Sequence, residues 1–362
     1  MKKMALGFIF IISILILSAC TKPGSMFSIS FFEYMDTYIS ISVYAQDQKT
    51  ADEYEVVIQD IYKTYHELST NYEPLSEDSL FLENIYTINQ KNNQVIEIDE
   101  ELYHLIEKAE EIRVLTDGYF DISIGEVVNI WKNLLIDEEN GYLFSEIPDS
   151  VFQTVLEQIE LINLEEDVIE LTSQNDRFYI QVKSTHAQLD LGAISKGYAT
   201  QLVFEYLQGL DIQYFSISAG SSSIAVGQNQ AREGGIYNVS LANPLKTDST
   251  DRTYGMIYVK DIGVTTSGDY EQYATHQNLR YHHIVSPKTK LPMQYYHTIT
   301  VLGEDLGMLD AISTALFSMS PGTLDTWLDN HQSALNLEII QFNYDATIVT
   351  HMITTVFEEN AS

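Results

Sequence analysis

Residues 189–197 read Leu-Asp-Leu-Gly-Ala-Ile-Ser-Lys-Gly, and this stretch is the most informative one in the chain. An apolar, strand-like run ends at Asp190, turns at Gly192 and enters a helical pattern that carries Lys196. Backbone N–H groups at the start of a helix, with an ammonium nearby, suit an anion such as a phosphate. By itself a strand–glycine–helix turn with an exposed lysine is common packing, so the stretch needs support from the rest of the sequence.

The 362-residue chain is strongly acidic, with 19 Lys and Arg against 52 Asp and Glu and a formal net charge of −33. Such a surface repels nucleic acid, because nucleic-acid binding needs clustered Lys and Arg. It also repels a phosphorylated small molecule, unless a bound cation or local dipoles reverse the field at the site. The charge therefore argues against nucleic acid as a partner and indicates a metal ion.

The N-terminus has the pattern of an export signal. Two lysines precede a short apolar run over residues 5–17, and Leu17-Ser18-Ala19-Cys20 closes it. The run is too short for a comfortable transmembrane helix, and its closing residues resemble the lipobox of bacterial lipoproteins, whose cysteine is diacylated. We therefore expect residues 1–19 to be a removed signal peptide and residues 20–28 a tether. Lipidated Cys20 would anchor the protein to the extracytoplasmic face of the cell membrane.

The rest of the chain, residues 29–358, is predicted to form one large α+β domain. Cys20 is the only cysteine, so no disulfide stabilises it, but 45% hydrophobic residues suffice for a large core. No Pro/Gly-rich linker divides it, and the acidic residues 136–165 are expected to be a peripheral insertion. Helical periodicity covers 50–69, 100–116, 195–207 and 303–320. Strand patterns cover 29–43, 169–183 (two strands), 214–218, 236–242, 255–266, 280–285 and the tail from 337.

The helical pattern over 303–320 contains Asp310-Ala311-Ile312-Ser313-Thr314. Asp310 and Thr314 are four residues apart and share a helix face. A carboxylate and a hydroxyl stacked there suit a hard cation such as Mg²⁺, which prefers oxygen ligands. A carbonyl at the Gly192-Ala193 turn is a candidate further ligand. The alternative is a polar stripe in which Thr314 bonds back to a main-chain carbonyl.

Two more clusters combine groups that bear chemistry. Tyr119-Phe120-Asp121 sets aromatic rings beside a carboxylate, an arrangement that suits either the floor of a planar-ring site or ordinary core. His282 and His283 follow the small-residue segment Thr265–Tyr270 and precede a Ser-Pro turn. In a strand over 280–285 the two histidines point to opposite faces, so at most one of them faces a site.

Taken in order, these blocks resemble the ApbE family of flavin transferases, which use FAD to attach FMN to a protein threonine. The resemblance extends over nearly the whole mature chain. Each block by itself is a weak signal, but the set of blocks in this order is specific for the family. The matching blocks are Met35-Asp36-Thr37, Gly118 to Asp121 with Gly125 and Asn129-Ile130-Trp131, Leu189 to Tyr198, Thr266 to Tyr270, Tyr281 to Ile284 and Asp310 to Thr314.

The resemblance implies an α+β fold of the ApbE type, FAD as substrate, Mg²⁺ as cofactor and an acceptor protein with a target threonine. It implies that His283, with His282 as the alternative, is the catalytic histidine beside the pyrophosphate. It implies a metal site formed by the Ala193 carbonyl, the Asp310 carboxylate and the Thr314 hydroxyl, with Ser313 in the same motif. The FAD contacts that it implies are Met35, Tyr119, Phe120, Asp121, Asp190, Lys196 and Ile284.

Several positions depart from the family pattern and affect the flavin pocket more than the metal site. Ile122 replaces a usual proline, Lys132 and Lys290 replace glycines, and Ser286 replaces an aspartate. The usual Asn-x-Gly-Gly-Asp loop is Ser218-Ala219-Gly220-Ser221-Ser222 here.

Two other functions remain as alternatives at this stage. If water replaces the acceptor, the same pocket hydrolyses FAD to FMN and AMP with Mg²⁺. A non-catalytic flavin-binding lipoprotein is the second alternative, and it predicts that bound FAD stays intact.

Overall fold

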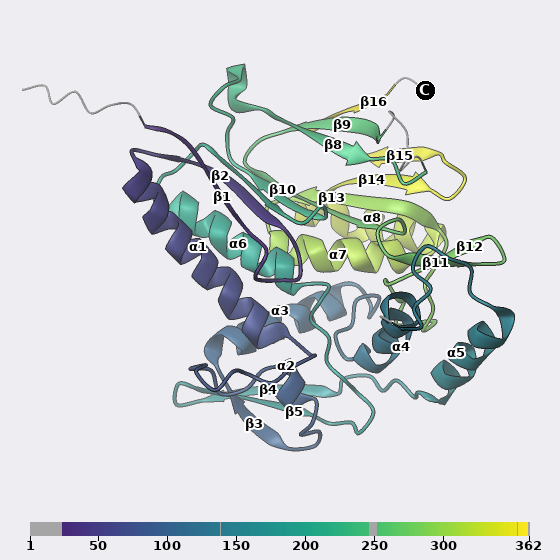
Figure 1. Cartoon of the computed structure of the whole chain (residues 1–362). Helices are drawn as coiled ribbons and strands as arrows, with labels where there is room; N and C mark the ends of the chain where they lie inside the picture. The colour runs from purple at the N-terminus through teal and green to yellow at the C-terminus, as the bar shows by residue number, and fades with distance from the viewer. Residues whose placement is uncertain (1–23, 138, 246–251, 353, 361–362) are drawn as a thin grey trace, which may run out of the picture.

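The computed structural model describes residues 24–137, 139–245, 252–352 and 354–360 (Figure 1). The expected signal peptide, the lipidation site Cys20 and residues 20–23 of the expected tether therefore lie outside the described residues. Residues 25–28 of the expected tether belong instead to strand β1 (Ser25–Phe31), which pairs with the next strand of the sheet. Within the described ranges, no helix combines the length and the apolar character that crossing a membrane requires.

An eight-stranded antiparallel sheet forms the centre of the molecule (Figure 1). Its spatial order is β1-β2-β6-β7-β10-β13-β14-β15. Successive side chains of a strand point to opposite faces of the sheet, so each strand can pack against other elements on both faces. The strands are β1 (Ser25–Phe31), β2 (Ile39–Ala45), β6 (Phe215–Ala219), β7 (Ser223–Val226), β10 (Ile262–Gly268), β13 (Tyr296–Gly303), β14 (Glu338–Asn343) and β15 (Ile348–His351).

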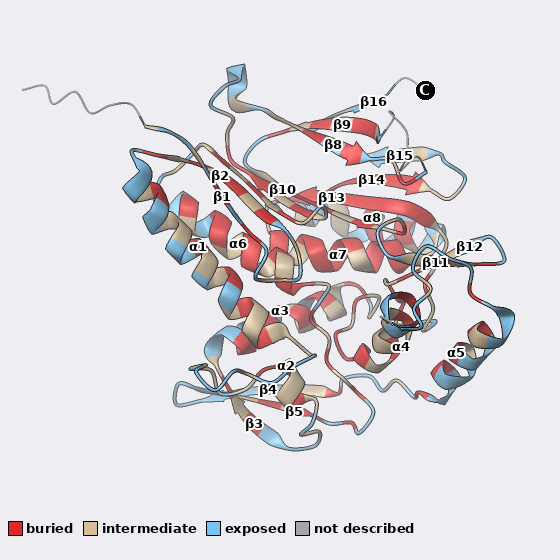
Figure 2. Cartoon of the chain, in the orientation of Figure 1, coloured by how far each residue is buried: buried red, intermediate tan, exposed pale blue. Residues whose placement is uncertain are grey.

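Helices α6 (Ser195–Gly209) and α7 (Leu306–Ser318) cover one face of this sheet, and α1 (Gln48–Ser69) packs beside α6. Most residues of α7 are buried, as Figure 2 shows, because the helix lies between the sheet and the helices around it. A helix that is apolar on nearly every side needs such a central position. The polar residue Asp310 in its middle is therefore a conspicuous exception.

A smaller sheet covers the other face of the central sheet and has the order β16-β9-β8. Its strands are β8 (Tyr237–Ala242), β9 (Thr253–Val259) and β16 (Val356–Glu359). Val239 and Ile257 from this sheet meet Val264, Leu302 and Ile340 from the central one in a separate apolar cluster. The central sheet is thus packed on both faces, by helices on one and by a sheet on the other.

The remaining elements form two peripheral units. A third sheet, of order β3-β5-β4, packs against α3. Around Trp131, a second apolar cluster joins α4 and α5 to the β11–β12 hairpin, and the Trp131 ring stacks on Tyr281 with centroids 5.6 Å apart. The elements of these two units are β3 (Val95–Ile98), α3 (Glu100–Leu115), α4 (Gly125–Ile136), α5 (Asp149–Leu161), β4 (Ile169–Gln174), β5 (Arg177–Val182), β11 (Tyr273–His276) and β12 (Leu279–His282). Two further helices, α2 (Ile85–Ile88) and α8 (Pro321–Leu335), pack in the main core, and a 3₁₀ turn covers Glu233–Gly235.

The predicted elements differ from the structure in three places. The strand expected over 29–43 is two strands, because Met35 and Asp36 adopt left-handed backbone angles and turn the chain. Asp261 does the same between β9 and β10, which were expected as one strand over 255–266. The pattern expected over 303–320 is followed directly by a further helix, α8, which Pro321 begins, because a missing N–H is tolerated in the first turn.

Candidate active site

The Asp190–Lys196 turn joins a strand-like segment to the start of α6. Asp190 Oδ1 accepts a hydrogen bond of 2.7 Å from the Gly192 N–H, and this bond holds the turn. The Ile194 and Ser195 N–H groups bond to the Leu191 carbonyl, and the Gly197 N–H bonds to a side chain of α7. The N–H groups of Ala193 and Lys196 have no partner among the described hydrogen bonds and remain available. The predicted anion-binding turn is therefore present, with Lys196 in the first turn of the helix.

Asp310 of α7 lies directly against the start of α6. Its Oδ2 atom accepts from the Gly197 N–H at 2.8 Å and lies 3.4 Å from Lys196 Nζ, while Oδ1 accepts from Ser223 Oγ at 2.8 Å. A Cβ on Gly197 would lie 2.7 Å from Asp310 Cβ and 2.5 Å from the Leu306 carbonyl oxygen. Glycine at position 197 is what lets the two helices approach this closely.

Ser313 and Thr314 lie on the turn of α7 that follows Asp310. Thr314 Oγ1 donates to the Asp310 carbonyl at 3.2 Å, as the alternative interpretation expected, and it also lies at the wall of a cleft. Ser313 is buried and shares a 2.8 Å hydrogen bond with Ser267 Oγ of β10. Ser313 does not line that cleft, so the structure gives it a packing position behind Thr314.

Two clefts adjoin at the Gly192 turn. The larger, of about 330 Å³, contains Met35, Asp190 and Lys196 in its wall. The smaller, of about 110 Å³, contains Ala193, Lys196, Ile284, Asp310 and Thr314. The residues common to both are Gly192, Lys196, Glu271 and His283. The two clefts therefore bring together most of the residues that the sequence analysis selected from five separate segments.

The donor set of the smaller cleft fits a hard cation. Within the described ranges no group of three or more His, Cys, Asp or Glu side chains could hold a metal ion. A site made of one carboxylate, one hydroxyl and one main-chain carbonyl is not such a group, because it contains a single acidic residue. Asp310, Thr314 and Ala193 offer oxygen atoms only, which is the chemistry that Mg²⁺ prefers.

His282 and His283 point to opposite sides, because successive side chains of a strand alternate between its two faces. His283 follows β12 and lines both clefts, and its buried Nδ1 atom has no hydrogen-bond partner in the described part of the chain. His282 is buried away from the clefts; its Nε2 atom lies 2.9 Å from the Met293 carbonyl and its ring packs on Phe317. The structure thus places His283, and not His282, at the cleft.

A buried ion cluster fixes the hairpin that precedes His283. Asp269 is fully buried, and its two oxygens lie 2.9 Å from a guanidinium nitrogen of Arg280 and 2.7 Å from His297 Nδ1. This cluster ties the end of β10 to β12 and β13. It therefore holds Glu271 and His283, at the two ends of the hairpin segment, beside the Gly192 turn.

The structure leaves Tyr119, Phe120 and Asp121 outside these two clefts. Phe120 is buried in the main core, and Asp121 accepts hydrogen bonds from the main chain and the hydroxyl of Ser123. Tyr119 lines a separate surface pocket beside α8. Their geometry favours the packing interpretation that was weighed for this block, and their expected contact with FAD stays a prediction.

Sequence reasoning did not select several residues that line the larger cleft. Lys132, Asn71 and Tyr72 come from α4 and from the segment after α1, and Glu271 follows Tyr270. Lys132 was noted only as a departure from the family pattern. The periodicity of a sequence gives no signal that these distant segments converge at one turn.

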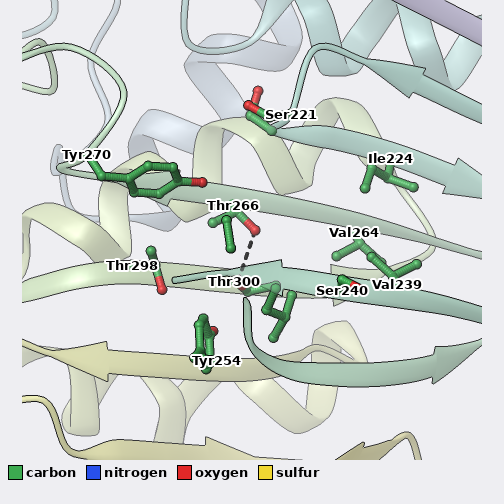
Figure 3. Close-up of a pocket in the computed structure, with 13 residues that line it drawn as sticks. Ser221, Ile224, Val239, Ser240, Tyr254, Val264, Thr266, Tyr270, Thr298 and Thr300 are labelled. Carbon is green, nitrogen blue, oxygen red and sulfur yellow. Dashed lines mark hydrogen bonds between the residues drawn. The ribbon is translucent and has the colours of Figure 1, made fainter. Parts of the chain in front are cut away.

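A third cavity, of about 140 Å³, lies between the central sheet and the β16-β9-β8 sheet (Figure 3). It shares Ser222, Thr266 and Tyr270 with the smaller cleft. Its wall combines aliphatic side chains with hydroxyls and contains no charged residue among those described; Thr266 and Thr300 share a 2.9 Å hydrogen bond there. This cavity suits an uncharged group rather than a phosphate.

Solved structures share the fold of this chain. The ApbE protein of Thermotoga maritima aligns with a TM-score of 0.72 at 25% identity, over 90% of this chain and 97% of that one. The flavin transferase ApbE of Vibrio cholerae aligns with a TM-score of 0.69 at 21% identity, over 91% and 97%, and supports the fold alone. These likenesses confirm the predicted mixed α/β fold of the ApbE type.

Curated proteins agree with the structural comparison. A protein named FAD:protein FMN transferase in Haemophilus influenzae is 27% identical over 88% of this chain and 87% of its own length. One with the same name in Vibrio cholerae is 25% identical over 85% of each chain. The fold, the cleft and these relatives define the chain as an enzyme of the transferase class. More particularly, the model of the ApbE family matches residues 35–337, and the chain belongs to that family.

Proposed function

We propose that this chain is a FAD:protein FMN transferase that attaches FMN through a phosphoester to a threonine of an exported or membrane protein and releases AMP. The observation that supports it most is the meeting of the Gly192 turn, Lys196, Asp310, Thr314 and His283 at two adjoining clefts. The relatives named FAD:protein FMN transferase support the same reaction.

The N-terminal end of α6 and the ammonium of Lys196 bind the pyrophosphate of FAD in this proposal. The main-chain N–H groups of Ala193 and Lys196, which have no partner among the described hydrogen bonds, would donate to the phosphate oxygens. Asp310 fixes Lys196 beside the start of α6, because it accepts from the Gly197 N–H and pairs with Lys196. Carboxylates also line the two clefts, so a dianion in this chain of net charge −33 needs a bound cation beside Lys196.

Asp310, Thr314 and the Ala193 carbonyl would hold Mg²⁺ beside the phosphates. When bound, Mg²⁺ neutralises phosphate charge and stabilises the charge that develops as the phosphoryl bond breaks. Ser223 and Gly197 keep the Asp310 carboxylate oriented by their hydrogen bonds, so this ligand is in place in advance.

His283 takes the proton from the attacking threonine hydroxyl in this proposal. Burial, and after it the neighbouring His282, lowers the pKa of His283 to about 4. The imidazole is therefore neutral near pH 7 and able to accept a proton. The new bond joins the threonine oxygen to the FMN phosphorus, the bond to the AMP phosphate oxygen breaks, and AMP leaves with that electron pair.

The cell-membrane anchor belongs to the same proposal. The Leu17-Ser18-Ala19-Cys20 pattern supports lipidation of Cys20, which would hold the enzyme on the extracytoplasmic face, where exported acceptors are found. These residues lie outside the described part of the chain, so their support comes from the sequence only.

Replacement of Asp310 tests the proposed metal site. The Asp310→Ala variant loses a metal ligand and the partner of Lys196, so Mg²⁺-dependent transfer of FMN to an acceptor should fall about a hundredfold or more. Asp305→Ala is the matched control, because Asp305 lies on the same helix, caps it through the Met308 N–H and is absent from both clefts. FMN incorporation, measured at several Mg²⁺ concentrations, should persist in this control; unchanged transfer by Asp310→Ala would refute the metal assignment.

A further inference from the structure

Lys132 of α4 lines the larger cleft, beside the Gly192 turn. Its Nζ atom lies 2.9 Å from Asp190 Oδ2 and 3.3 Å from the Tyr72 hydroxyl, and it is 5.8 Å from the centroid of the Tyr72 ring. Its side chain is only 21% exposed. A lysine held this far from bulk water needs compensation, which the Asp190 carboxylate provides.

The ammonium of Lys132 is charged at neutral pH. Burial by itself lowers its pKa, but the Asp190 carboxylate and the Tyr72 side chain outweigh burial and raise the pKa above its ordinary value. An ammonium has three N–H donors, and two of them are used by Asp190 and Tyr72. One donor remains for a group within the cleft.

Lys132 and Lys196 flank the Gly192 turn from two sides. A Cβ placed on Gly192 would lie 3.8 Å from Lys132 Nζ, so this ammonium lies directly beside the turn. Lys196 lines the same cleft and lies 3.4 Å from Asp310. A chain with 19 basic residues against 52 acidic ones thus places two cations beside this turn.

Each of the two lysines has a carboxylate partner, Asp190 for Lys132 and Asp310 for Lys196. Asp190 also accepts from the Gly192 N–H at 2.7 Å and lies 3.3 Å from Asn71 Nδ2, so its oxygens have several donors. The third N–H of Lys132 and the main-chain N–H groups of Ala193 and Lys196 have no partner among the described hydrogen bonds. These donors favour a further acceptor in the cleft, and a phosphate oxygen has the matching charge.

We propose that Lys132 is a second phosphate-binding residue, which contacts a phosphate of the dinucleotide substrate while its ion pair with Asp190 sets its position. This inference rests on the proposed function, because it takes FAD as the ligand of the cleft. It assigns to α4 a share of substrate binding that a glycine at position 132, as in the family pattern, does not provide.

Binding of three ligands to Lys132→Met in the full chain tests the inference. Calorimetry or flavin fluorescence gives the dissociation constants for FAD, for AMP and for riboflavin, which lacks phosphate. The affinity for FAD should fall about tenfold or more, since a charge-assisted hydrogen bond is lost, whereas riboflavin binding should stay unchanged. The loss for FAD should shrink at high salt, because screening weakens the contact in the unaltered protein.

Lys288→Met is the matched control for the change in net charge. Lys288 lies over the ring of Tyr119, outside both clefts, so its removal should leave FAD affinity unchanged. Lys132→Arg keeps the cation and should recover most of the affinity that Lys132→Met loses. Thermal unfolding of each variant shows whether it is folded.

Two results would overturn the inference. An equal loss of riboflavin and FAD affinity in Lys132→Met would mean that the lysine shapes a ring pocket, and unchanged FAD affinity would mean that it only braces Asp190. Lack of FAD binding by the unaltered protein is a separate result, and it would contradict the proposed function itself.

Discussion

His283 is the residue whose surroundings say most about the chemistry. It lines both clefts, and a buried environment holds its pKa at about 4, whereas His282 is bonded to a main-chain carbonyl behind it. A base is useful only in its unprotonated form, so a lowered pKa extends its working range toward acid. His283 is thus unprotonated at neutral pH, as a proton acceptor must be.

The pH dependence of transfer follows from that pKa. Since His283 is unprotonated above about pH 4, kcat/KM for transfer should stay high as the pH falls through 6.5, the usual pKa of histidine, and decline only at lower pH. A profile between pH 4 and 8 measures this. A decline centred at 6.5 or above in the free enzyme would contradict the assignment of His283 as the base.

Replacement of the two histidines separates their roles. His283→Ala should lower kcat about 10²- to 10⁴-fold, the usual contribution of a positioned base, with FAD affinity largely kept. His282→Gln should instead lower the melting temperature, because it disturbs the buried bond to the Met293 carbonyl. If His282→Gln abolishes transfer in a folded protein while His283→Ala does not, the roles are reversed.

The residues of the Gly192 turn and of α7 could be identified from the sequence, because their spacing along the chain determines which side chains lie close together. Asp310 and Thr314 share a helix face by periodicity alone, and the strand–glycine–helix pattern places Lys196 at a helix start. The sequence did not settle which of His282 and His283 faces the cleft, because that depends on how strand β12, which ends at His282, is oriented in the fold. Lys132 was noted only as a departure from the family pattern, since its partner Asp190 is distant in sequence and close only in the fold.

The contact between α6 and α7 is the element-scale feature on which the site depends. Each helix carries part of the site, Lys196 on α6 and Asp310 on α7, and Gly197 allows their close approach. A small displacement of one helix would separate the anion-binding turn from the proposed metal ligands. The relative position of these two helices is therefore as important as the residues that they carry.

Gly197→Ala tests this contact. A methyl group would meet the Leu306 carbonyl and Asp310 Cβ at less than 3 Å, so the variant should lose about 1–3 kcal/mol of unfolding free energy, with reduced transfer. Gly209→Ala on the same helix is the matched control, because nothing lies within 4 Å of its added Cβ. It should be neutral or up to about 1 kcal/mol more stable by denaturant unfolding. Equal behaviour of the two variants would contradict the close-packing account.

The elements themselves were mostly predictable, and the failures share one physical cause. α1, α3, α6 and α7 appear near their expected bounds, because amphipathic periods and end signals agree there. The long strands expected over 29–43 and 255–266 were wrong, since Asp36 and Asp261 take left-handed turns that the alternation of polar and apolar residues does not reveal. The pairing of strands distant in sequence, such as β2 with β6, also lies beyond local patterns.

At the scale of the whole molecule, the acidic charge extends into the site. The net charge of −33 makes the surface repel nucleotides in general, and carboxylates accompany Lys132 and Lys196 in the lining of the two clefts. A bound divalent cation would reverse the field there. The whole-molecule charge thus favours ligands that reach the cleft together with a metal ion.

Cys20 sets the expected location of the whole molecule. Cys20→Ser removes the thiol that the proposed diacylation needs, so the protein should leave the membrane fraction and lose incorporation of labelled palmitate. The purified variant should keep its affinity for FAD, since the clefts lie far along the chain in residues 35–314. Membrane association that persists in Cys20→Ser would refute the lipid anchor.

Mass spectrometry of an acceptor protein tests the central claim most directly. The purified chain is incubated with FAD, Mg²⁺ and a candidate exported acceptor that contains threonine, and the acceptor is weighed intact and after digestion. We predict one FMN on a threonine, AMP released in equal amount, and neither product with Asp310→Ala. Free FMN and AMP beside an unmodified acceptor would indicate hydrolysis, FAD left intact would indicate a binding protein, and either result would contradict the proposed transferase.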